Sequence, residues 1–126
     1  MGLERKFTVL MADDDDDCEF AKEAFSVCCP QTAVDCVLDG MDLMDYLSEH
    51  SRSESIGLPQ LILLDLNMPR KDGRQALLEI KADPTLREIP IVIFTTSKEE
   101  KDISFTMKAG AELFITKPAS FEEWVP

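Results

Sequence analysis

Carboxylates dominate the residues of this chain that could carry chemistry. Five consecutive aspartates occupy positions 13–17, directly after the apolar run FTVLMA at 7–12, and Asp65 follows the apolar run LILL at 61–64. Carboxylates held close together repel one another, and a divalent cation that prefers oxygen ligands removes the conflict. These residues therefore favour a Mg²⁺ site, in which a carboxylate facing the metal can also act as a nucleophile towards a phosphoryl group.

Hydroxyl groups and a lysine follow two further apolar runs. Thr95, Thr96 and Ser97 come after the run at 89–94, and Lys117 comes after the run at 113–116. Phosphoryl transfer depends mainly on positioning and on neutralising charge, which an ammonium and a hydroxyl opposite a metal can supply. The four segments could act together only if the fold brings their ends to one place.

Apolar periodicity predicts elements that do so. Strands are expected at 7–12, 32–38, 61–64, 89–94 and 113–116, and helical patterns lie between them at 18–29, after Asp39, at 73–82 and from Ser97 to Gly110. This alternation predicts an α/β domain with a parallel sheet and helices on both faces. Ligands of such sheets bind beyond the carboxyl ends of the strands, where these polar residues stand.

Within the expected site, Asp65 is the better nucleophile candidate because it ends the central strand, and Met68-Pro69 holds the next loop extended. Asp13 and Asp14 are better placed as metal ligands. The aspartates at 15–17 lie at the start of the next helix, where the helix dipole favours negative charge, and this structural role is the interpretation preferred for them. Ser97 to Glu100 has the form of a capping box, and Gly110 that of a C-cap.

The net charge, the lengths of the apolar runs and the cysteine pattern exclude some classes of function. A net charge of −12 argues against a nucleic-acid surface, and no apolar run approaches the length of a membrane span. The start of the chain lacks the apolar stretch of a signal peptide, so a cytoplasmic location is expected. Four cysteines without a CxxC pair are interpreted as small buried hydrophobes of a reducing compartment.

Four segments resemble the signature blocks of bacterial response-regulator receiver domains: VLMADD (9–14), LILLDLNMPRKDG (61–73), IVIFTTS (91–97) and KAGAELFITKP (108–118). The residues of the second and third segments are similar to those of single-domain regulators paired with cyanobacterial phytochromes and related light-sensing kinases. The resemblance implies a single receiver domain over 1–126, with a doubly wound five-stranded parallel sheet in the flavodoxin-like order 2-1-3-4-5. The family's fifth helix would be shortened or missing here, because only 119–126 remain for it.

The resemblance also implies a role for each site residue. Asp65 would be the phosphoacceptor, Thr95 the switch hydroxyl and Phe114 the aromatic switch residue. Lys117 would pair with the phosphoryl oxygens, and the Lys117–Pro118 peptide bond would be cis. The Mg²⁺ ligands would be the carboxylates of Asp13, Asp14 and Asp65 and the backbone carbonyl of Asn67.

The function so implied is that of a stand-alone response regulator, which catalyses only its own phosphorylation and dephosphorylation. A sensor histidine kinase, of the phytochrome-like kind, would donate the phosphoryl group in a Mg²⁺-dependent reaction. The resulting conformational switch would act on a downstream protein or through a homodimer. Neither a nucleic acid nor a membrane is expected as a partner.

Four rival interpretations stay open at this point. A degenerate receiver would share the fold but act only as an interaction module. A dehalogenase-type phosphatase usually has a second aspartate two positions after the nucleophile, where this chain has Asn67. A calcium protein would need a DxDxDG loop with a glutamate at position twelve, which is absent. A flavodoxin-like electron carrier would need a phosphate-binding loop after the first strand, where five aspartates would repel a flavin phosphate.

Overall fold

The computed structural model describes residues 7–51 and 57–117, and within them strands and helices alternate along the chain. The strands are β1 (Phe7–Ala12), β2 (Thr32–Val37), β3 (Leu61–Leu64), β4 (Ile91–Thr95) and β5 (Leu113–Thr116). The helices are α1 (Asp15–Cys28), α2 (Gly40–Ser51), α3 (Gly73–Ala82) and α4 (Glu100–Ala109).

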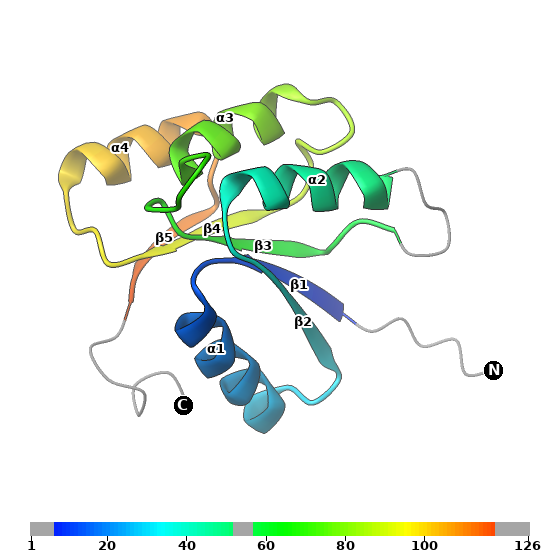
Figure 1. Ribbon diagram of the computed structural model, residues 1–126. Coiled ribbons are helices and arrows are strands. Elements are labelled where there is room, and N and C mark those ends of the chain that lie inside the picture. The colour runs from blue at the N-terminus through cyan, green and yellow to red at the C-terminus, as the bar shows by residue number, and fades with distance from the viewer. Residues whose placement is uncertain (1–6, 52–56, 118–126) are drawn as a thin grey trace.

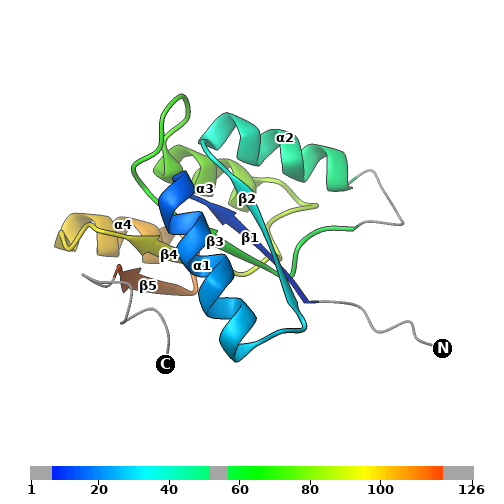
Figure 2. The ribbon, with the colours of Figure 1, turned by 60° about the horizontal axis from the view of Figure 1, so that its bottom comes forward.

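The five strands form one parallel sheet in the order β2-β1-β3-β4-β5. Helix α1 covers one face, and α2, α3 and α4 cover the other (Figure 1). Figure 2 brings the α1 face forward, with α1 in front of the strands. The predicted doubly wound sheet and its strand order are confirmed. The order reverses between β1 and β3, which makes their carboxyl ends the switch point of the sheet.

The two faces of the sheet bury unequal cores. The larger core fills the space under α2, α3 and α4, and its strand residues alternate with those that point the other way. The smaller core, under α1, is built from Met11, Cys18 and Ala21.

Of the cysteines, Cys18 is buried while Cys28 is exposed, so the prediction that all four are buried is wrong. The reason is that Cys28 ends α1 beyond the face that packs on the sheet.

Several element ends differ by one to three residues from the sequence-based expectation, among them those of β4 and α4. Strand β4 begins at Ile91 rather than 89 and includes Thr95, which pairs with Thr116 of β5. The prediction of a capping box at the start of α4 is wrong, because Glu99 occupies the N-cap position and its side chain makes no capping hydrogen bond. The Ser97 hydroxyl instead donates to Asp102 and accepts from the Glu99 backbone N–H. The expected Gly110 C-cap is confirmed, in the left-handed region at φ 114°.

The outer edge strand β5 keeps apolar side chains at the surface. Leu113 and Ile115 are 55% and 42% exposed, on the side of the sheet that α1 also covers. The expected shortened fifth helix falls on 119–126, outside the described residues. The expected cis Lys117–Pro118 bond involves Pro118, which also lies outside them. Within 7–51 and 57–117, no helix has the length and apolar character that crossing a membrane requires.

Candidate functional site

Strand pairing brings the predicted site residues to one edge of the sheet. The backbone N–H of Asp13 donates to Val37 (3.1 Å), and that of Asp65 donates to Ala12 (3.0 Å). The parallel pairing therefore continues one residue past β1 and β3, and it sets Asp13 and Asp65 side by side at the switch point. Across the sheet, the Lys117 N–H donates to the Thr95 carbonyl at 2.8 Å, just past β5.

The Lys117 ammonium is the centre of the site. Its Nζ lies 2.9 Å from Oδ1 and 2.8 Å from Oδ2 of Asp13, 2.5 Å from Oδ2 of Asp17 and 3.4 Å from Oδ2 of Asp65. The Lys117 side chain is only 7% exposed. Residues separated by as many as 104 positions therefore meet in one ion-pair cluster, as the sequence predicted for Lys117, Asp13 and Asp65.

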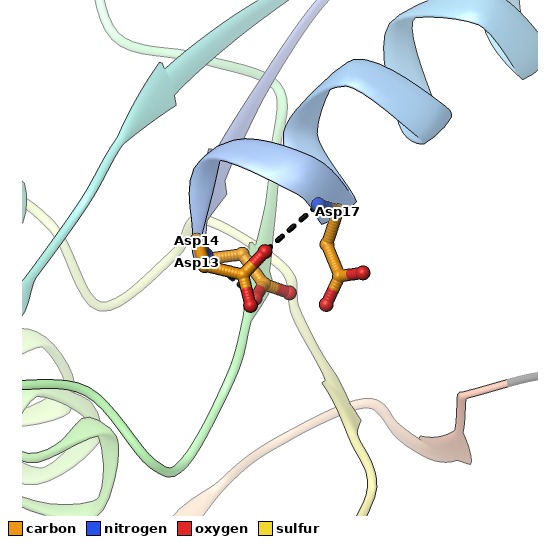
Figure 3. A group of neighbouring side chains, drawn as sticks. All are labelled: Asp13, Asp14 and Asp17. Atoms are coloured by element: carbon orange, nitrogen blue, oxygen red, sulfur yellow. Dashed lines mark hydrogen bonds between the residues drawn. The ribbon is translucent and has the colours of Figure 1, made fainter.

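Asp17 was not expected in this cluster. Asp14 caps α1, because its Oδ1 accepts from the Asp17 backbone N–H at 2.8 Å. This cap turns the first helical turn so that the Asp17 side chain lies beside those of Asp13 and Asp14 (Figure 3). Oxygens of these three carboxylates lie within 4.8 Å of one another. Interpreting Asp17 as a helix-end charge alone is wrong, since it also pairs with Lys117.

Burial dominates the electrostatics of Asp13. The residue is 1% exposed, and this burial raises the pKa of its carboxyl to about 7, even though Lys117 and the Asp14 N–H stabilise the charged form. Burial alone would lower the pKa of Lys117, but its hydrogen bonds to Asp13 and Asp17 outweigh it and raise that pKa. Four carboxylates lie around one ammonium; those of Asp13 and Asp65 are buried, Asp17 is partly buried and Asp14 is exposed.

The residues present fit a divalent cation. Oδ2 of Asp13 is buried and has no hydrogen-bond partner among the described residues, although it faces the Lys117 ammonium in the ion pair. A buried carboxylate oxygen without a hydrogen bond is costly, and a hard cation would satisfy it. The donor set is made only of oxygen atoms, as Mg²⁺ and related ions prefer.

The loop after β3 is held firmly around Asp65. Asn67 N–H lies 3.4 Å from Asp65 Oδ1, a long hydrogen bond. Arg70, at a positive φ of 64°, donates to Asp39 at 2.7 and 3.2 Å and to Asp42 at 2.9 Å. The Arg70 guanidinium holds the pKa of Asp39 below its usual value. These bonds tie the loop that carries Asn67 to the start of α2.

The two residues expected to act as the switch lie on neighbouring strands, Thr95 on β4 and Phe114 on β5. Thr95 is fully buried, and its hydroxyl accepts a long hydrogen bond of 3.4 Å from the Ser97 N–H. Phe114 is half-buried and packs against the larger core. Thr95 is the last residue of β4, whereas the sequence analysis placed it directly after the strand.

A second charged network, which the sequence analysis missed, anchors the β4–α4 loop. Arg74 of α3 donates two bonds of 2.9 Å to the buried Asp102 of α4, and the Ser97 hydroxyl donates to the same carboxylate at 2.7 Å. Hydrogen bonds from these partners lower the pKa of the Asp102 carboxyl, and the bond from Ser97 has the largest effect. A polar pocket opens beside this network and beside Asn67. The spacing of residues 74 and 102 in the sequence does not predict this ion pair, because the pair depends on how α3 and α4 pack.

The fold and the site together define a class of protein. Residues 9–125 match the family model of the response regulator receiver domain, so this chain belongs to that family. Receiver domains are the phosphoacceptor modules of two-component signalling and take their phosphoryl group from histidine kinases.

Among its relatives, the chain is 33% identical over 118 residues to the response regulator Rcp1 of Synechocystis, a match that covers 94% of this chain and 80% of Rcp1. The phosphorylated cyanobacterial phytochrome response regulator RcpA superimposes with a TM-score of 0.86 at 37% identity, over 95% of this chain and 86% of RcpA. The Mn²⁺-bound form of Rcp1 gives a TM-score of 0.83 at 32% identity, over 93% and 85%. The resemblance noted from the motifs is thus confirmed, including its likeness to regulators of the phytochrome type.

Proposed function

We propose that Asp65 is the phosphoacceptor of this receiver domain and that the reaction depends on Mg²⁺. The observation that carries the proposal is the convergence of Lys117 on Asp13 and Asp65 at the switch point of the sheet. Asp65 is 8% exposed and Asp13 is 1% exposed, so Asp65 is the more accessible of the two carboxylates that follow β1 and β3. Phosphorylated RcpA and Mn²⁺-bound Rcp1 support the proposal by analogy.

The chemistry is a transfer between a phosphohistidine and a carboxylate. An oxygen of Asp65 attacks phosphorus, so that an O–P bond forms while the N–P bond to the imidazole breaks. The electron pair of the broken bond goes to the imidazole nitrogen, which takes up a proton from solvent. The Lys117 ammonium, 3.4 Å from Asp65, is placed to bind the oxygens of the incoming group.

Asp13, Asp14, Asp65 and the Asn67 carbonyl would hold the metal. A bound Mg²⁺ supplies neutralisation of the negative charge that collects around the phosphoryl group. This chain's own residues do the positioning: β1 and β3 set Asp13 and Asp65, the Arg70 contacts hold the Asn67 loop, and the helix cap fixes Asp14.

The signal would leave the site through Thr95 and Phe114. A phosphoryl group on Asp65 offers three acceptor oxygens, and the Thr95 hydroxyl, which accepts a long hydrogen bond from the Ser97 N–H, can donate its proton to one of them. Movement of Thr95 frees space beside β5 into which Phe114 can turn. Because Phe114 has no hydroxyl, packing alone decides its rotation.

The partner is a sensor histidine kinase, of the phytochrome-like kind, and residues 1–126 act as one receiver domain in the cytoplasm. The relatives named above motivate the choice of kinase. The response passes to a downstream protein or to a second copy of the chain through protein contacts.

The test is phosphorylation by acetyl phosphate, followed by intact mass. Wild type with Mg²⁺ is expected to gain one phosphoryl group, whereas Asp65→Asn and wild type with a chelator gain none. Asp72→Asn serves as a matched control, because Asp72 caps α3 and asparagine keeps that cap. Failure of wild type to react or to bind beryllofluoride would favour the degenerate interaction module instead.

A further inference from the structure

The contacts of Lys117 are unequal, and the shortest is to a residue outside the expected site. An ammonium has three N–H donors, and here they face three carboxylates. The distance is 2.5 Å to Asp17, 2.8 and 2.9 Å to Asp13, and 3.4 Å to Asp65. Lys117 therefore lies nearer to the start of α1 than to the carboxylate proposed to receive the phosphoryl group.

Asp17 is fixed where it can keep Lys117 in that position. It lies in the first turn of α1, and its backbone N–H is bonded to the Asp14 cap. The Asp17 side chain is 21% exposed, so its ion pair with the buried ammonium is only partly screened by solvent. Its carboxylate neither caps the helix nor follows a strand end, and its one described side-chain partner is Lys117.

We infer that Asp17 is a positioning residue that draws the Lys117 ammonium away from Asp65 and thereby disfavours the phosphorylated state. The inference rests on the proposed roles of Asp65 and Lys117. A phosphoryl group on Asp65 needs the ammonium, and Asp17 competes for it. The Asp17 carboxylate also repels the negative phosphoryl oxygens, while the same charge attracts a divalent cation.

Asp17 should therefore act in opposite directions on the two ligands of the site. Removing its charge is expected to strengthen binding of a phosphoryl group and to weaken binding of Mg²⁺. A residue with only a structural role would change both affinities in the same sense or neither. This opposition is the signature to measure.

The experiment compares wild type, Asp17→Asn and Asp16→Asn. Asp16 is exposed in the same helical turn, so its variant loses the same charge without touching a described partner of Lys117. For Asp17→Asn we expect the dissociation constant of beryllofluoride at saturating Mg²⁺ to fall roughly threefold to tenfold, and that of Mg²⁺ alone to rise by a similar factor. Both constants of Asp16→Asn should stay within about twofold of wild type.

Each outcome bears on the inference. Unchanged constants in Asp17→Asn, a change of both in the same direction, or an equal effect in Asp16→Asn would overturn it while leaving the proposed function intact, provided that wild type binds beryllofluoride. Wild type that binds no beryllofluoride with Mg²⁺ would remove the proposed function and this inference together. A longer lifetime of the phosphoryl group in Asp17→Asn, after acetyl phosphate is removed, would support the inference independently.

Discussion

Gly73 lies directly against the backbone of Asp65: a Cβ at residue 73 would come within 2.2 Å of the Asp65 carbonyl oxygen and 2.8 Å of Leu66 Cα. The Gly73 N–H also donates to the Leu66 carbonyl at 3.0 Å. Helix α3 therefore starts in contact with the end of β3, and this contact sets the path of the loop that carries Asn67. Packing against the end of β3 therefore explains why a glycine follows Asp72 in the sequence motif.

Gly73→Ala should destabilise the fold by about 1–3 kcal/mol, because backbone atoms must shift to admit the methyl group. Urea unfolding measures the effect. Gln75→Ala is the control, since Gln75 is exposed in the same helix and should change stability by less than about 0.5 kcal/mol. Equal stability of the Gly73 and Gln75 variants would contradict the close approach.

Mg²⁺ should stabilise the protein through the carboxylate cluster. By linkage, Mg²⁺ at about 100 times its dissociation constant adds about 2.7 kcal/mol to the free energy of unfolding. Asp14→Asn should lose most of this gain while it keeps the stability of the metal-free protein, because asparagine also caps helices well. Urea unfolding with and without Mg²⁺ tests this; a full Mg²⁺ effect in Asp14→Asn would remove Asp14 from the ligand set.

Arg74→Ala should lower the free energy of unfolding by about 1–2 kcal/mol at pH 7, since it leaves the buried Asp102 with fewer partners. The folded-state pKa of Asp102 is lowered, so its contribution is present above the unfolded value of about 3.9 and is lost as the pH falls through the folded value. The difference from wild type should therefore shrink in acid. Arg87→Ala, at an exposed arginine, is the control. A difference that is the same at every pH would contradict the account.

Thr95→Val should separate phosphorylation from switching. Valine keeps the branched shape in a fully buried position but removes the hydroxyl. We expect the variant to accept the phosphoryl group yet to lose the change in amide hydrogen exchange around β4 and β5 that wild type shows with beryllofluoride. Thr116→Val, at the paired position on β5, should keep that change. A wild-type response in Thr95→Val would exclude Thr95 as the switch hydroxyl.

The parallel sheet and the meeting of distant residues were predictable because they follow from periodicity and from the βα alternation, whereas the strand order was implied by the family resemblance. Asp13, Asp65 and Lys117 each come one residue after a strand, and the carboxyl ends of adjacent parallel strands share an edge. The sequence therefore placed these three side chains correctly without any knowledge of side-chain geometry.

The predictions that proved wrong concern side chains that have more than one possible hydrogen-bond or ion-pair partner. Ser97 has the spacing of a capping box, but the buried Asp102 carboxylate is the stronger acceptor for its hydroxyl. Asp17 has a helix-end position that explains its charge, yet Lys117 approaches it from β5, 100 residues away. Neither outcome can be derived from spacing, because each depends on the packing of α4 or β5 against another element.

The central claim is that the phosphoryl group forms an acyl phosphate on Asp65, and the most direct measurement is to map it. Protein treated with acetyl phosphate and Mg²⁺ is reduced with borohydride, which converts a phosphorylated aspartate to homoserine, and is then digested for peptide mass spectrometry. We predict homoserine at position 65 alone, and none after omission of Mg²⁺. Homoserine at 13, 14 or 17, or its absence from 65 in phosphorylated protein, would contradict the account.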